Sequence, residues 1–86
     1  MAKMTKAEAA WVAEVQAVLD RCPSERLGFF TIGDRDVSIF NKAKEEAANK
    51  LMDTRKASDF GPALDQVNGR FNASLIFPTN VYSTAG

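Results

Sequence analysis

The segment Leu27-Gly28-Phe29-Phe30-Thr31-Ile32-Gly33-Asp34-Arg35-Asp36-Val37-Ser38-Ile39-Phe40 decides the fold of this chain, because it has the pattern of a β-hairpin. Leu27–Ile32 is rich in residue types that favour strands, and Asp36–Phe40 alternates polar and apolar side chains. The residues between these runs, Gly33–Asp36, are typical of a tight turn. We therefore predict two antiparallel strands joined by that turn.

A third strand is predicted toward the other end of the chain. Phe71–Gly86 has no charged side chain, although 26% of all residues are Asp, Glu, Lys or Arg. Within it, Ser74–Phe77 favours a strand, and Val81–Gly86 is expected to form a tail or an edge segment. An uncharged, partly apolar chain end is normally covered by the fold or by a partner. We therefore expect Val81 and Tyr82 to lie near a self-association or partner surface.

An amphipathic helix is predicted before the hairpin. Thr5 and Glu8 have the spacing of a capping box, and the helix should end within the two residues before Pro23, which cannot continue it. Helical periodicity places on one stripe the residues Trp11, Val15, Val18, Leu19 and Cys22. We expect this stripe to pack on the sheet, with Trp11 largely buried and Cys22 a small residue of the core.

Two more helices are predicted between the hairpin and the last strand. Asn41 offers a cap for a helix from Lys42 to about Asp53, which should lie on the surface because its apolar stripe is thin. That stripe consists of Ala43, Ala47, Leu51 and Met52. Ser58 or Asp59 offers a cap for a short helix with one apolar edge formed by Ala63, Leu64 and Val67. The predicted order is α-β-β-α-α-β, an α+β fold with a three-stranded, mainly antiparallel sheet packed by two to three helices.

Size and composition indicate one small globular domain over residues 1–86. An apolar fraction of 45% with six Phe, one Trp and one Tyr is enough for a core without metal or disulfide support. Eleven basic and eleven acidic residues cancel, which removes the simplest argument for nonspecific nucleic-acid binding. The chain has no histidine, so the usual Ser-His and Cys-His nucleophiles and the common zinc ligand sets are excluded.

The sequence favours a cytoplasmic protein that is not inserted in a membrane. A single cysteine, Cys22, cannot form an internal disulfide, which fits a reducing compartment. Met1–Lys6 has no apolar run of the kind that a secretory signal needs, and no window approaches the ~18 apolar residues of a membrane span.

The acidic hairpin tip is a candidate cation site. Asp34 and Asp36 are separated by one residue, and two carboxylates so placed can hold a hard cation such as Mg²⁺, with a third acid from Asp53 or Asp59. Acids and Gly at a tight turn are also expected for conformational reasons alone. We favour the turn interpretation, and a metal-dependent enzyme at this tip is the third functional alternative.

The segment 42–56 is the candidate nucleic-acid surface. It is locally basic through Lys42, Lys44, Lys50, Arg55 and Lys56. Glu45, Glu46 and Asp53 lie among these residues, and helical spacing scatters the charges around the helix. Phe29, Phe30 and Phe40 on neighbouring strands resemble a base-stacking sheet, but few Arg and Lys flank them. A solvated helix and a packed core are therefore the favoured interpretations.

Two segments carry a resemblance to a group of known proteins. Arg26-Leu27-Gly28-Phe29-Phe30-Thr31-Ile32-Gly33-Asp34 and Phe77-Pro78-Thr79-Asn80-Val81-Tyr82-Ser83-Thr84-Ala85-Gly86 resemble segments of small proteins encoded by bacterial phages and prophages. The resemblance implies a bacterial cytoplasmic setting. It implies no assigned activity and no functional residues, because the segments form no catalytic signature.

These observations favour a small, non-enzymatic protein-interaction module, such as a phage or prophage accessory factor. No catalytic residue, metal ligand or cofactor is predicted, and a protein partner or self-association is expected through a surface that includes Val81 and Tyr82. The alternative is a nucleic-acid-associated protein that uses segment 42–56.

Overall fold

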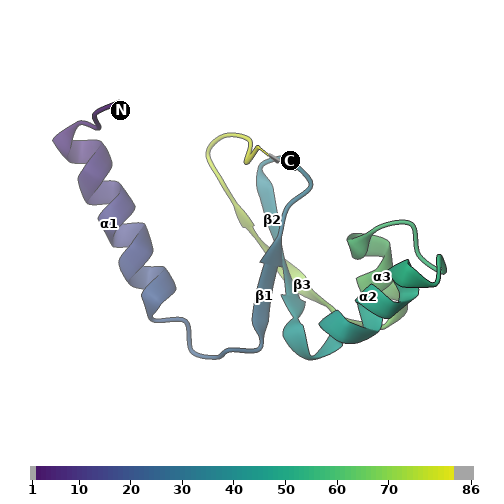
Figure 1. Cartoon of the computed structure of the whole chain (residues 1–86). Coiled ribbons are helices and arrows are strands. Elements are labelled where there is room, and N and C mark those ends of the chain that lie inside the picture. Colours follow the sequence, from purple (N-terminus) through teal and green to yellow (C-terminus); the bar gives the residue numbers. More distant parts are fainter. Residues whose placement is uncertain (1, 83–86) are drawn as a thin grey trace.

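The computed structural model describes residues 2–82 and has the α+β architecture that the sequence predicts (Figure 1). In chain order the elements are α1 (Lys6–Asp20), β1 (Leu27–Phe30), β2 (Asp36–Asn41), a 3₁₀ turn η1 (Lys42–Lys44), α2 (Glu45–Asp53), α3 (Phe60–Gln66) and β3 (Arg70–Ile76). The predicted order α-β-β-α-α-β is confirmed.

The three strands form one antiparallel sheet in the order β1-β2-β3. Phe29 of β1 lies opposite Ile39 of β2, and Val37 of β2 lies opposite Leu75 of β3. Because side chains alternate along a strand, these four residues share one face of the sheet. Phe40 points to the other face, and this second face meets helices α2 and α3.

The turn between β1 and β2 is wider than the predicted Gly33–Asp36. Side chains of the turn accept hydrogen bonds from its backbone N–H groups, in place of further pairing between the two strands. β1 ends at Phe30 instead of Ile32. The N–H of Gly33 donates to Thr31 Oγ1 (3.2 Å), and the N–H of Asp36 donates to Asp34 Oδ1 (2.9 Å). Gly33 has a φ of 93°, which side-chain-bearing residues rarely adopt.

β3 is longer than the predicted strand Ser74–Phe77. It already begins at Arg70, with three residues between it and the end of α3 at Gln66. The N–H of Asn41 at the end of β2 donates to the carbonyl oxygen of Gly69 (2.7 Å), so β2 and β3 are linked at this point. Pairing with β2 therefore draws in residues such as Asn72 that have a low strand propensity of their own.

The core lies between one face of the sheet and helices α2 and α3. The rings of Phe30, Phe40 and Phe60 meet edge-on, with centroids 5.1, 5.4 and 6.0 Å apart. Such edge-to-face contacts are favourable beyond the area that they bury. Leu64 of α3 and Ala48 of α2 are fully buried beside them. The predicted apolar edge of the third helix is thus confirmed.

Helix α2 lies on the surface as predicted but turns a different face inward. Ala48 is buried, and Leu51 and Met52 are half-buried against the core, whereas Ala43 and Ala47 of the predicted stripe are exposed. At about 100° per residue the inward face is centred near Ala48, so Ala47 lies at its border, while Ala43 belongs to the 3₁₀ turn η1, which has a different periodicity.

Both core helices end in a Schellman motif, in which the residue after the last turn has a left-handed backbone. At the end of α2, Arg55 has a φ of 59°. The N–H of Arg55 donates to the carbonyl of Met52 (3.1 Å), and the N–H of Lys56 donates to that of Leu51 (2.8 Å). Asn68, with a φ of 54°, ends α3 in the same way.

Helix α1 begins as predicted but does not pack on the sheet. The capping box is present, because Thr5 N donates to Glu8 Oε1 (2.8 Å) and Glu8 N donates to Thr5 Oγ1 (3.1 Å). The helix also ends where predicted, with Arg21 as its C-cap, but the predicted packing of its stripe is wrong. Trp11 is 53% exposed, Cys22 is exposed, and none of residues 6–20 is buried.

The linker after α1 accounts for this difference, because it directs the helix away from the sheet (Figure 1). The radius of gyration is 15.6 Å, against about 12 Å for a compact chain of this length. Helical periodicity correctly identified the residues that share a stripe, but it carries no information about what the stripe touches.

Candidate functional site

The chain after β3 folds across the hairpin tip, and this arrangement positions the predicted interaction residues. The N–H of Phe77 donates to the carbonyl of Arg35 (2.8 Å), and Arg35 Nε donates back to the carbonyl of Phe77 (3.2 Å). The N–H of Val81 then donates to the carbonyl of Asp34 (2.7 Å). In Figure 1 the yellow end of the ribbon lies beside the turn between β1 and β2. Residues 77–81 are therefore tied to the tip at two places.

Apolar side chains are strongly exposed at this end of the sheet. Tyr82 is 82% exposed, Ile32 is 75% exposed and Ile76 is 71% exposed, while Val81 is half-buried. Ile76 lies opposite Asp36 at the start of β2, and Ile32 follows the end of β1. We call these four residues, Ile32, Ile76, Val81 and Tyr82, the tip surface.

Sequence reasoning named Val81 and Tyr82 but missed Ile32 and Ile76. It assigned Ile32 to the first strand and Ile76 to the third, and a strand residue is normally half-covered. The available signal was the turn sequence, because a wider turn leaves Ile32 without a strand partner. The remaining part of the predicted tail, residues 83–86, lies outside the described residues.

The acidic residues of the tip have a turn geometry. Asp34 accepts a hydrogen bond from the N–H of Asp36 through its own carboxylate (2.9 Å), as an Asx turn requires. Asp59 lines the same shallow hollow as these two residues, but its carboxylate caps α3 by accepting from the N–H of Phe60 (2.8 Å). Within residues 2–82, no three Cys, Asp or Glu side chains lie close enough together to hold a metal ion.

One basic side chain, that of Arg70, lines the same hollow, and it already forms an ion pair. Arg70 of β3 forms an ion pair with Asp65 of α3, with Nε 3.0 Å from Oδ1. Its guanidinium also lies 5.2 Å from the centroid of the Phe30 ring. The contacts with Asp65 and Phe30 fix this side chain at the border between the sheet and α3.

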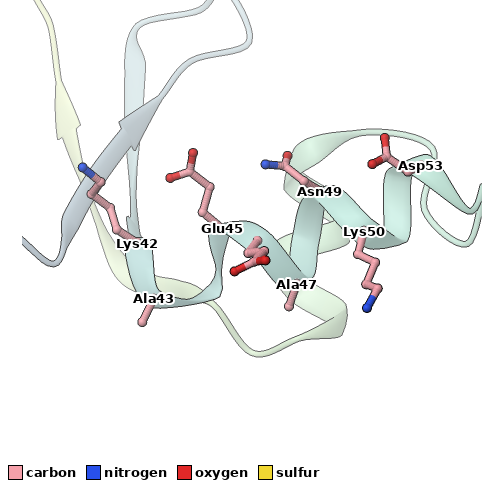
Figure 2. A pocket seen from close by; sticks show the side chains of 8 residues that line it. Lys42, Ala43, Glu45, Ala47, Asn49, Lys50 and Asp53 are labelled. Atoms are coloured by element: carbon pink, nitrogen blue, oxygen red, sulfur yellow. The ribbon is translucent and has the colours of Figure 1, made fainter.

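The basic segment 42–56 does not gather its charges on one side. A hollow along η1 and α2 is lined by Lys42, Ala43, Glu45, Glu46, Ala47, Asn49, Lys50 and Asp53. Figure 2 shows that Lys42 and Lys50 point to opposite sides, and that Glu45 and Asp53 point to the same side as Lys42. Three acidic and two basic side chains therefore line this hollow, so its surface is not basic.

The other predicted contacts lie at the two ends of this segment. Lys44 is in η1, while Arg55 and Lys56 follow the end of α2, where the Arg55 backbone serves the Schellman motif. Nucleic-acid binding by these residues stays a prediction. A band shift with DNA or RNA that weakens steeply with salt is its test.

Two findings bear on wider relationships. Within residues 2–82, no helix combines the length and the apolar composition needed to cross a membrane. Comparisons with protein-family models, with curated proteins and with solved structures find no match for this chain.

Proposed function

We propose that this protein is a non-enzymatic protein-interaction module that binds a partner through the tip surface. The observation that carries the proposal is the exposure of Tyr82, Ile32 and Ile76, which all belong to the end of the sheet that carries the hairpin turn. Tyr is enriched among the residues that dominate binding energy, because its ring buries a large area and its hydroxyl still forms a hydrogen bond. The phage or prophage setting that the sequence resemblance implies belongs to the same proposal.

The edge of β3 supports a specific mode of binding. β3 is an outer strand of the sheet, and beyond Arg70 it has no charged side chain. Charged residues are a common device that discourages strand pairing at an edge. An edge strand without them accepts an extended segment of another protein as a further strand, with main-chain hydrogen bonds for affinity and side chains for specificity. Ile76 and Tyr82 would anchor such a segment.

The test is a pull-down from a bacterial lysate with the tagged full-length chain. We compare the wild type with the double variant Ile32→Thr/Tyr82→Ser, which removes apolar surface at exposed positions. The matched control is Asp34→Asn/Asp36→Asn, which alters the same tip but keeps its turn chemistry. We expect a protein that the wild type and the control retain and that the Ile32→Thr/Tyr82→Ser variant loses. Identical retention by all three proteins contradicts the proposal.

A further inference from the structure

Helix α1 presents an apolar stripe that the rest of its own chain leaves open. Between 44% and 60% of each of the following residues is exposed: Met4, Trp11, Val12, Val18 and Leu19. Trp11 and Val18 are seven residues apart, so they lie on one side of the helix, and Met4 precedes the N-cap Thr5. Soluble monomers rarely expose a continuous apolar stripe of this length.

The face of the sheet that points away from α2 and α3 is also apolar and open. Phe29, Val37, Ile39 and Leu75 point away from the core that α2 and α3 form with Phe40. Phe29 is 46% exposed and Leu75 is 40% exposed. One chain therefore carries two apolar surfaces of complementary kind, a helix stripe and a sheet face. A helix covering a sheet face is the standard way in which an α+β layer buries both.

Helix α1 also needs a partner to be stable. It has 15 residues, and isolated helices of about 12–15 residues are marginal in water even when they are rich in Ala. Tertiary packing of an apolar face supplies most of the stability of a helix in a protein. The capping box at Thr5 and Glu8 helps α1 to start, but it does not replace that packing.

The linker keeps α1 away from its own sheet. Cys22 Sγ donates to the carbonyl of Ser24 (3.3 Å), and Ser24 Oγ accepts from the N–H of Arg26 (3.0 Å). The carbonyl of Arg26 accepts from the N–H of Lys42 (2.8 Å), and its guanidinium lies 5.0 Å from the centroid of the Phe71 ring. Docking of α1 on a second chain leaves all of these contacts in place.

The exposed area is large enough for an extensive homodimer interface. The chain exposes 6987 Å², against about 5,000 Å² for a compact monomer of this mass. The excess is about 2,000 Å² for each chain, and two chains together have about 4,000 Å² to hide, within the range of about 2,000–5,000 Å² that obligate homodimer interfaces bury.

We infer that the protein forms a two-fold dimer in which α1 of each chain lies on the open sheet face of the other. The lengths agree, since 15 helical residues span about 22 Å and the seven residues of β3 span about 23 Å. Two-fold symmetry covers both stripes and both sheet faces at once. The tip surface is not part of this contact.

The test is sedimentation equilibrium of the purified full-length chain over a range of concentrations, with fluorescence of Trp11, the only Trp, as a second readout. We expect twice the mass of one 9.4 kDa chain, and Trp11 emission that shifts to shorter wavelength as the dimer forms. The variant Trp11→Ala/Val18→Ala keeps the helix propensity and removes the stripe. It should weaken dimerisation at least about tenfold, while the control Gln16→Ala on the opposite side should not.

A second variant tests the identity of the contacted surface. Phe29→Thr/Leu75→Thr keeps strand propensity and removes the apolar sheet face, so it should be monomeric on its own. Circular dichroism checks its fold, and Leu75→Thr alone serves if the double variant is disordered. Mixed with Trp11→Ala/Val18→Ala, it should form a heterodimer, because the intact α1 of one chain meets the intact sheet of the other.

The alternatives give different results. A monomer at every concentration overturns the inference, and shielded Trp11 in that monomer identifies docking of α1 on its own sheet. A dimer that survives Phe29→Thr/Leu75→Thr indicates α1 pairing with α1 and also overturns it. So does a mixture of the two variants that stays monomeric, or open-ended assembly in place of a dimer.

Discussion

Replacement of Leu64 by Ala is the sharpest test of where the core lies. Leu64 is the largest side chain that is fully buried, and it packs in one cluster with Phe40, Ala48 and Ala63. Truncating a buried Leu to Ala removes apolar contacts and leaves a cavity, at a cost of about 3 kcal/mol. The whole free energy of unfolding of an 86-residue chain is about 4–13 kcal/mol. We therefore expect the variant to lose a large part of its stability.

The matching replacement, Trp11→Ala, should have little effect, although Trp is the larger side chain. Trp11 is half-exposed on a helix that contacts the core poorly, and Ala favours a helix more than Trp does. Exposed substitutions away from the core change the free energy of unfolding by less than about 1 kcal/mol. Size alone would rank these two variants in the opposite order.

The assay is urea unfolding followed by circular dichroism, at concentrations where the chain is monomeric. With an m-value of about 1 kcal/mol per molar urea, Leu64→Ala should lower the midpoint by about 3 M. The control Leu64→Met, which conserves volume, should lower it by less than about 1.5 M. An equal fall for Trp11→Ala and Leu64→Ala would refute the reasoning, because it would mean that α1 belongs to the core of the monomer.

Three further predictions concern the helix end, the turn and the chain end. Arg55→Gly should raise the free energy of unfolding by up to about 1 kcal/mol in thermal or urea melts, because Gly adopts the left-handed backbone without strain, and no change would contradict the Schellman assignment. Asp34→Asn/Asp36→Asn should keep the fold and give the same calorimetric trace with Mg²⁺ as the wild type. A Mg²⁺ binding signal that the wild type gives and this variant lacks would support the metal hypothesis instead. Truncation after Pro78 should leave a folded domain that binds its partner less well. Truncation before Ser74 should unfold the chain, because a sheet of this kind needs three strands. If the shorter chain still unfolds cooperatively, and is therefore folded, this prediction is wrong.

The sequence alone determined the features that depend on neighbours within a few residues. The capping box of Thr5 and Glu8, the cap at Asn41 and the hairpin turn were all predicted, because each is a hydrogen bond or a backbone preference confined to a short segment. The order of helices and strands followed from the same local signals. The interaction role of Val81 and Tyr82 stays a prediction, although their link to the hairpin tip is now defined.

Only the tertiary structure decided which surfaces meet. Phe29 and Phe30 are adjacent and chemically identical, yet Phe30 joins the aromatic core while Phe29 lies on the open face, because strand register sends them to opposite sides. Likewise the Trp11 stripe is a real stripe of α1, but the linker directs it away from the sheet of its own chain. Periodicity identifies the residues that share a face. What that face contacts depends on the path of the chain between distant segments, which the periodicity of a single helix or strand does not specify.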